Sequence, residues 1–241
     1  MTDRPVVGEP APSPPLPEPE WGLGDAALGF FLGLWLSVAF SVVWVGVSGQ
    51  GTGDLGTFVA SVVGLWTGLG AALANACLRK GSRSLAVDFG LRVERSDILP
   101  GVIAGVASQL VMIPLLYLPF RLLGHDLDVS EKAKEVTDLA KGAGVVVIPL
   151  LIVVGAPLVE ELFFRGLLQR SVARRLGPVA AVAISAVTFG VAHFQPVQLL
   201  GLVAFGVVLG ILAQRAGRLG PSLIAHMCFN AVTVVILLTN H

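Results

Sequence analysis

The chain has 241 residues, of which 54% are hydrophobic and 13% are charged, and its mean hydropathy is +0.82. An average soluble domain carries about 25% charged residues, so this composition indicates a polytopic membrane protein and not a domain with a single buried core. The 16 basic and 16 acidic residues cancel. Since no basic stripe is present to neutralise phosphates, we expect no nucleic-acid partner. The hydrophobic composition makes the lipid bilayer the expected surroundings.

The first 22 residues are predicted to form a disordered, proline-rich tail. Seven of the 15 prolines lie in the first 20 residues, and such a composition favours extended, unpacked chain. The tail lacks the basic stretch that opens a cleaved signal peptide, so we expect the first hydrophobic helix to be retained.

Seven hydrophobic stretches follow, and a bilayer-crossing helix needs about 20 such residues. They are predicted at 26–47, 56–78, 98–120, 143–168, 178–194, 197–213 and 221–239. The fifth and sixth are short and tightly connected at Gln195-Pro196, so a re-entrant pair is the alternative to two crossings. The predicted fold class is all-α, a polytopic transmembrane helical bundle of about seven spans.

Basic residues gather after the second, fourth and sixth stretches, which fall on one side if there are seven crossings. They are Arg79, Lys80, Arg83, Arg92, Arg95, Arg170, Arg174, Arg175, Arg215 and Arg218. The positive-inside rule makes this side cytoplasmic. We therefore expect an integral protein of a bacterial-type cytoplasmic membrane with its N-terminus inside. The loop after the third stretch, with Arg121 and three lysines, is the exception.

Residues 23–142 are predicted to hold the N-terminal spans and an amphipathic surface helix at 129–141. Apolar residues such as Val129, Ala133 and Val136 recur there at helical spacing among charged ones, which is typical of a helix at the membrane surface. We expect an interfacial connector, with a lid over a site as the alternative.

Four GxxxG pairs lie in these stretches, and close helix packing is sufficient to explain them. The pairs are Gly29/Gly33, Gly64/Gly68, Gly101/Gly105 and Gly206/Gly210.

Three charged residues, Glu160, Glu161 and Arg165, interrupt the fourth stretch. A charge at bilayer depth costs at least ~2.5–3.5 kcal/mol on insertion scales, so this cluster needs a reason. Glu161 and Arg165 are at i,i+4 and are predicted to form an ion pair. Glu160 is rotated from Glu161 by ~100° around the helix, which leaves it as a carboxylate able to exchange protons. The alternative is a structural polar network that locks helices together.

Further polar residues occur in two later stretches. His193 ends the fifth, and taken alone it is interfacial as readily as catalytic. His226 and Asn230 share one face of the last stretch, where both are costly unless they face a cavity or polar neighbours. Taken alone, this pair is either a link between helices or a functional site.

The expected depths of Glu160 and His226 in the membrane, counted from the nearest basic loop, do not agree. At ~1.5 Å per residue, Glu160 lies about 22 Å from Arg175, whereas His226 lies only about 12 Å from Arg218. Either the last helix begins deeper in the bundle, or the sixth stretch does not cross fully.

The ordered set EExxxR, FxxxH and HxxxN, each in its own apolar helix, begins at Glu160, Phe189 and His226. It resembles the CPBP family, which contains the type II CAAX prenyl proteases and bacteriocin-processing or immunity-related membrane proteins. The resemblance covers residues 143–240. Within them, the stretch 155–159 before Glu160 and the stretch 165–168 after Phe164 also resemble the family. The resemblance predicts a protease core at 143–241.

The resemblance implies an intramembrane endopeptidase acting on membrane-associated, prenylated or lipid-proximal peptides. Glu160 would activate the attacking water, and His193 would hold or polarise that water. His226 and Asn230 would stabilise the oxyanion, with Glu161 and Arg165 in support. The partner would be a membrane protein or peptide substrate.

Zinc is an open question, because two histidines, a glutamate and a water are also a zinc-type ligand set. The candidate ligands are Glu160, His193 and His226. The chain has no HExxH, and these residues come from three separate helices. This favours a metal-free, glutamate-activated water without deciding against zinc.

Two other classes of function stay open at this point. One is a non-catalytic membrane immunity or scaffold protein of the same fold. The other is a proton or ion transporter that uses Glu160, His193 and His226 as a relay. The sequence does not give the substrate, its prenylation or the oligomeric state.

Overall fold

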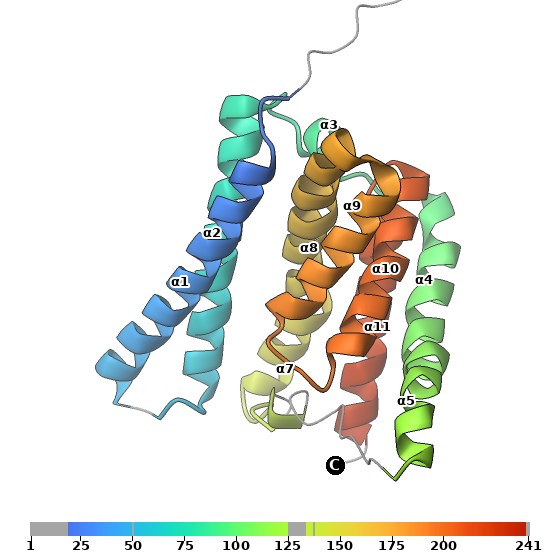
Figure 1. Ribbon diagram of the computed structural model, residues 1–241. Helices are drawn as coiled ribbons and strands as arrows, with labels where there is room; N and C mark the ends of the chain where they lie inside the picture. The colour runs from blue at the N-terminus through green and yellow to red at the C-terminus, as the bar shows by residue number, and fades with distance from the viewer. Residues whose placement is uncertain (1–18, 50, 125–133, 137, 240–241) are drawn as a thin grey trace, which may run out of the picture.

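The computed structural model describes residues 19–49, 51–124, 134–136 and 138–239, and this part of the chain is an all-α bundle. Helices α1 (Leu23–Ser48) and α2 (Leu55–Lys80) form an antiparallel hairpin at one side of the molecule (Figure 1). The short helices α3 (Leu85–Asp88) and η1 (Arg95–Asp97) lead into a third long rod, made of α4 (Ile98–Ala107), the π-helical segment η2 (Ser108–Met112) and α5 (Ile113–Leu122).

The C-terminal half begins with one long rod that folds back on itself. It consists of α7 (Gly144–Pro149), π-helical η3 (Leu150–Gly155), α8 (Ala156–Glu160), π-helical η4 (Glu161–Gln169) and α9 (Arg170–Ala192). Two separate helices, α10 (Leu199–Ala216) and α11 (Gly220–Thr239), follow it. Inside α9 the chain turns at Gly177, whose φ of 81° favours glycine. Figure 1 shows the two limbs lying antiparallel.

Six described helices are long and apolar enough to cross a membrane, and one of them, Gly144–Ala192, has 49 residues. Unbroken, that helix would be roughly 74 Å long, more than twice the ~30 Å hydrocarbon core. The break at Gly177 divides it into a first limb, 144–176, that is long enough to cross and a shorter second limb, 178–192, of roughly 22 Å. The predicted all-α bundle of about seven spans is therefore confirmed.

The last helix begins deeper than the basic end of α9, which explains the mismatch in predicted depths. Arg170 Nη2 donates a hydrogen bond of 2.8 Å to the carbonyl of Gly217. The first residues of α11, Gly220 to Ser222, are buried. The start of α11 thus lies level with Arg170 and not with Arg175. His226 therefore lies at the same depth in the bundle as Glu160.

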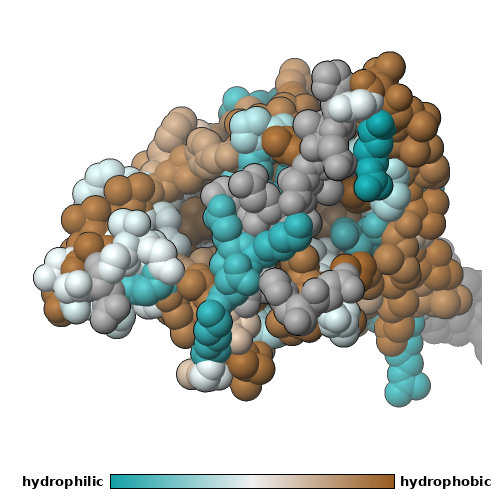
Figure 2. All heavy atoms as spheres, turned by 90° about the horizontal axis from the view of Figure 1, so that it is seen from below, coloured by the Kyte–Doolittle hydropathy of each residue, from teal (hydrophilic) through white to brown (hydrophobic). Residues whose placement is uncertain are grey.

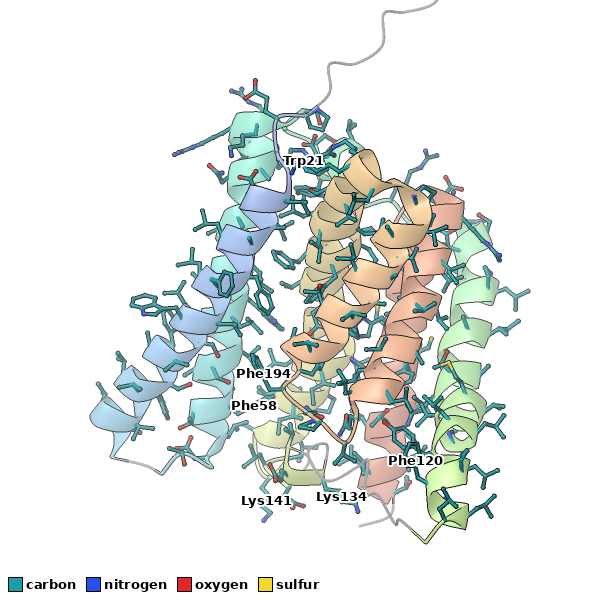
Figure 3. All side chains as sticks on the ribbon, viewed as in Figure 1. Trp21, Phe58, Phe120, Lys134, Lys141 and Phe194 are labelled. Atoms are coloured by element: carbon teal, nitrogen blue, oxygen red, sulfur yellow. The ribbon has the colours of Figure 1, made fainter. Side chains whose placement is uncertain are left out.

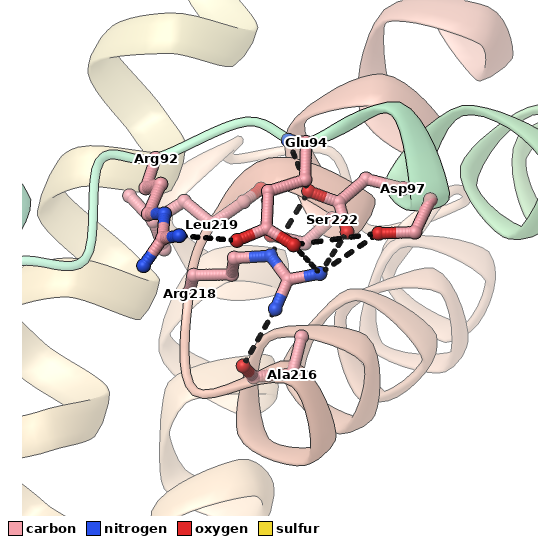
Figure 4. A network of polar contacts seen from close by, with 8 residues as sticks. Arg92, Glu94, Asp97, Ala216, Arg218, Leu219 and Ser222 are labelled. Carbon is pink, nitrogen blue, oxygen red and sulfur yellow. Dashed lines mark hydrogen bonds and ion pairs between the residues drawn. The ribbon is translucent and has the colours of Figure 1, made fainter.

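A polar network fixes this start of α11 to the start of α4 (Figure 4). Arg218 donates to both oxygens of Asp97, over 2.6 and 3.1 Å, and lies 3.1 Å from Glu94 Oε2. Hydrogen bonding to Asp97 raises the pKa of Arg218 above its usual value. A Cβ atom on Gly220 would collide with the Asp97 carboxylate, so glycine permits this close approach.

All four GxxxG pairs lie at helix contacts, as predicted. Gly29 and Gly33 face α2, Gly64 and Gly68 face α1, Gly101 and Gly105 face α11, and Gly206 and Gly210 face α9. Cβ atoms at these positions would meet the neighbouring helix at or inside van der Waals distance. Small residues therefore set the close packing of the bundle.

The packed region begins before α1. Trp21, which the predicted tail 1–22 includes, is 2% exposed. Its indole packs under the Arg174 guanidinium, 4.0 Å from the ring centroid, and beside Phe89 at 5.4 Å. Residues 19–22 thus belong to the bundle, and residues 1–18 lie outside the described part of the chain. Figure 3 shows Trp21 at the end where α1 begins, opposite Lys134 and Lys141.

Most of the predicted surface helix 129–141 falls outside the described residues, although residues 134–136 are helical. Figure 2 views that end of the molecule, and hydrophobic residues form most of its outer rim. Large apolar side chains on α1, such as Phe31 and Trp35, are about two-thirds exposed. An apolar rim of this kind suits contact with lipid.

Candidate active site

Glu161 and Arg165 form a buried ion pair at the junction of α8 and η4. Arg165 Nη1 lies 3.1 Å from Glu161 Oε1, and neither side chain has exposed surface. Arg165 Nη2 also donates to the carbonyl of Gly206 on α10, at 3.1 Å. The predicted ion pair is present, and it anchors η4 to α10.

His226 on α11 lies between the two neighbouring glutamates. Its Nδ1 is 3.0 Å from Glu161 Oε1, while its Nε2 is 3.7 Å from Glu160 Oε2. Glu161 thus holds the imidazole through one nitrogen and leaves the other facing Glu160. Both nitrogens of His226 are therefore directed at carboxylates of the EExxxR motif.

The two glutamates differ in access to solvent. The Glu160 side chain is 16% exposed, whereas that of Glu161 is fully buried. Of the two carboxylates, Glu160 is the one that a water or a substrate can reach. This division agrees with the one predicted from their positions around the helix.

Phe189 connects the two histidines. Its ring makes edge-to-face contacts with His193, at 4.7 Å between centroids, and with His226, at 5.6 Å. The Arg165 guanidinium lies 4.5 Å from the centre of the same ring. Cation–π and edge-to-face contacts of this kind fix orientation, so Phe189 is a packing centre of the site.

His193 caps the end of α9 and is held by its own helix. Its Nδ1 lies 2.7 Å from the carbonyl oxygen of Phe189. Because a carbonyl only accepts, Nδ1 must carry the hydrogen, and in the neutral ring Nε2 is then the acceptor. The next residue, Phe194, has a φ of 53°, an uncommon conformation for a non-glycine residue beside a candidate site.

Asn230 contacts a different part of the long rod. Its Nδ2 donates to the carbonyl of Ile152 in η3, at 2.8 Å. Within the helix, the Ala156 N–H donates to the carbonyl of Leu151, and Pro157 has no N–H. Asn230 thus satisfies a carbonyl that Pro157 leaves without a helical partner, and it retains a second amide hydrogen.

The structure therefore brings Glu160, Glu161, Arg165 and His226 together directly, and it adds His193 through Phe189. Asn230 lies one turn further along α11 and contacts η3. Sequence reasoning missed Gln169, whose Nε2 donates to the carbonyl of Gly210 one turn beyond the Arg165–Gly206 contact. Arg165 and Gln169 are four residues apart, as are Gly206 and Gly210. This matching spacing in the sequence could have indicated that Gln169 contacts Gly210.

The fit of these residues to a metal ion can be judged from their arrangement. Among the described residues, no three His, Cys, Asp or Glu side chains are grouped closely enough to hold one. Glu161 and Phe189 O engage only the Nδ1 atoms of His226 and His193, an arrangement that metal-binding histidines share. As grouped in this structure, the described residues do not fit a zinc site.

Comparisons with known proteins give one family match, in the C-terminal part of the chain, and one similar curated protein. Residues 142–232 match the family model described as type II CAAX prenyl endopeptidase Rce1-like. The chain is 28% identical over 109 residues to a Bacillus subtilis (strain 168) protein described as "Putative membrane peptidase YdiL". This match covers 44% of the chain and 43% of that protein, less than half of either. No solved structure matches significantly.

Proposed function

Because the segment 142–232 belongs to the CPBP family, the family of the type II CAAX prenyl endopeptidases, we propose that the protein is an intramembrane endopeptidase. The observation that carries the proposal is the contact of Glu160 with His226 across two helices, with Glu160 the more exposed of the two side chains. The substrate would be a membrane protein or a lipid-proximal peptide, prenylated or not.

In the proposed reaction, Glu160 is the base. The proposed water lies within ~2.8 Å of both Glu160 Oε2 and His226 Nε2, which the 3.7 Å between these atoms allows. Glu160 takes a proton from this water as its oxygen attacks the peptide carbonyl carbon. The same carboxyl then returns the proton to the amine nitrogen as the C–N bond breaks.

The remaining residues position these groups and stabilise charge. His193 Nε2 accepts a hydrogen bond from the water. His226, when Nε2 is protonated, and the second amide hydrogen of Asn230 donate to the oxyanion of the tetrahedral intermediate. Loss of one such donor typically lowers the rate by ~10²–10³. Glu161 and Arg165 act through His226 by fixing its ring.

The decisive test replaces Glu160 with Gln, which keeps the shape of the side chain and removes the base. We compare the membrane proteomes of a deletion strain complemented with wild-type protein or with Glu160→Gln. The expected result is one or more membrane proteins that stay uncleaved in both the deletion strain and the variant. Glu94→Gln, a change at the surface network, is the control and should restore cleavage. Normal cleavage in a well-folded Glu160→Gln protein would refute the proposal.

Metal dependence needs its own measurement. We expect purified protein to keep its activity after treatment with a zinc chelator, since the reaction proposed uses a glutamate and no metal. Inhibition by the chelator that added zinc reverses would assign Glu160, His193 and His226 to a metal site instead.

A further inference from the structure

A cavity lies at the basic end of the bundle, where η4 passes into α9 and α10 ends. Its volume is about 400 Å³, several times the ~30 Å³ that one water occupies in the liquid. Buried Arg165 and Gln169 form part of its floor, and exposed Arg174 and Gln214 form part of its rim. The cavity thus leads from the surface to the buried side of the Arg165–Glu161 pair.

The lining of this cavity is strongly basic. Arg165, Arg170 and Arg174 are among its lining residues, and no acidic residue is; of the three, Arg165 is already paired with Glu161. Arg170 donates to two neutral acceptors, the carbonyls of Gly217 at 2.8 Å and Asp88 at 3.4 Å. Those contacts satisfy hydrogen bonds without cancelling charge. The cavity therefore favours an anion that several guanidinium groups can approach.

Two residues of the lining each carry a buried polar atom that bears on the choice of ligand. Arg165 Nε and Gln169 Oε1 have no hydrogen-bond partner among the described residues, although their side chains are 1% and 3% exposed. The Gln169 amide cannot be turned round, because its Nε2 donates to Gly210 O and to Gln214 Oε1. Since unpaired buried polar atoms are costly, the ligand should accept from Arg165 and donate to Gln169.

We propose that this cavity binds a phosphate ester that also carries hydroxyl groups, as the headgroup of an anionic glycerophospholipid does. Phosphate oxygens match the planar guanidinium groups, and a hydroxyl supplies the donor that Gln169 Oε1 lacks. A basic pocket between transmembrane helices at headgroup level suits such a group. This site shares Arg165 with the proposed peptidase site, but binding of the phosphate ester does not depend on the peptidase chemistry.

The test titrates purified full-length protein in a neutral detergent with short-chain phosphatidylglycerol, short-chain phosphatidylcholine, glycerol 3-phosphate or inorganic phosphate. The readout is the melting temperature as a function of ligand concentration. Arg170→Gln removes one lining charge, and Ala173→Leu fills the cavity without changing charge. Arg175→Gln is the matched control, because it removes the same charge from the same helix and Arg175 does not line the cavity.

We expect phosphatidylglycerol to raise the melting temperature saturably and phosphatidylcholine to leave it unchanged. The half-saturating concentration should rise about tenfold or more in Arg170→Gln, as for loss of one charge-assisted hydrogen bond, and should rise similarly in Ala173→Leu. Arg175→Gln should match the wild type. An equal response to glycerol 3-phosphate or inorganic phosphate would keep the phosphate site and assign it a soluble ligand.

Two results would overturn the proposal. One is the absence of any saturable response. The other is an equal loss in Arg175→Gln, which would indicate diffuse attraction to a charged surface. If Arg170→Gln does not fold, Ala173→Leu decides alone, and an unchanged half-saturating concentration in that variant counts against the site.

Discussion

Two adjacent glutamates in this chain have opposite surroundings. Glu161 Oε1 is shared by Arg165 and by His226, at 3.1 and 3.0 Å, in a fully buried position. Glu160 is partly exposed and lies 3.7 Å from His226. The same substitution should therefore change stability at one position and activity at the other.

Glu161→Gln is expected to destabilise the protein by about 3–5 kcal/mol, because it leaves the buried Arg165 charge without its carboxylate. Thermal unfolding in detergent micelles measures this change. Glu160→Gln is the matched control, and its melting temperature should stay near that of the wild type. Equal melting temperatures for the two variants would show that the ion pair does not stabilise the bundle.

Phe194→Gly is expected to stabilise the protein by about 1 kcal/mol, since a left-handed conformation is costly for a residue with a Cβ atom. The φ of Phe194 is 53°, and its side chain is 68% exposed, so little packing is lost. Phe194→Ala keeps the strained conformation and should give no gain. If both variants shift the unfolding midpoint equally, strain is not the cause.

At the scale of elements, glycine pairs determine how closely helices approach. In α2, a Cβ atom on Gly68 would overlap the backbone of α1 at Gly33, whereas one on Gly70 would meet nothing within 4 Å. The two glycines differ only in which face of the helix they occupy. Their substitutions therefore separate packing from helix propensity.

Gly68→Ala is expected to cost about 1–3 kcal/mol, because α1 must move away from α2. Gly70→Ala should be neutral or stabilise by up to about 1 kcal/mol, since alanine has the better helix propensity. Unfolding monitored by circular dichroism in the same detergent gives both values. A neutral Gly68→Ala protein would mean that the hairpin is less tightly packed than described here.

The sequence predicted the elements well and their polar contacts less well. Span positions follow from local hydropathy, and the Glu161–Arg165 pair follows from helical spacing. The bond between Glu161 and His226 joins residues 65 positions apart, and no local pattern encodes such a pairing. The contact of Asn230 with Ile152 was not predicted either, because the carbonyl freed by Pro157 depends on where the π-helical segment η3 falls.

At the scale of the whole molecule, the basic loops and the start of α1 lie at one end. Glu20 N–H donates to the carbonyl of Lys80, and Trp21 stacks on Arg174. The short segment before α1 thus contacts the end of α2 through Glu20 and the start of α9 through Trp21. By the positive-inside rule this end should face the cytoplasm.

Labelling of intact cells with a membrane-impermeant maleimide tests this orientation. Ser82→Cys lies at the basic end and should stay unlabelled, whereas Gly53→Cys lies in the loop at the other end of the hairpin and should react. Both positions are exposed. The two native cysteines, Cys77 and Cys228, lie within helices α2 and α11, and the unsubstituted protein gives the background. The reverse labelling pattern would invert the topology.

The pairing of Glu161 with Arg165 inside one helix also bears on biosynthesis. A ribosome adds roughly 5–20 residues per second, so His226, 65 residues after Glu161, follows about 3–13 s later. During that interval the α8–η4 rod must reside in the translocon or the bilayer without its histidine. Arg165, four residues after Glu161, is synthesised almost at once and can neutralise Glu161 within the same nascent helix. His226 joins the cluster only after α11 has been synthesised.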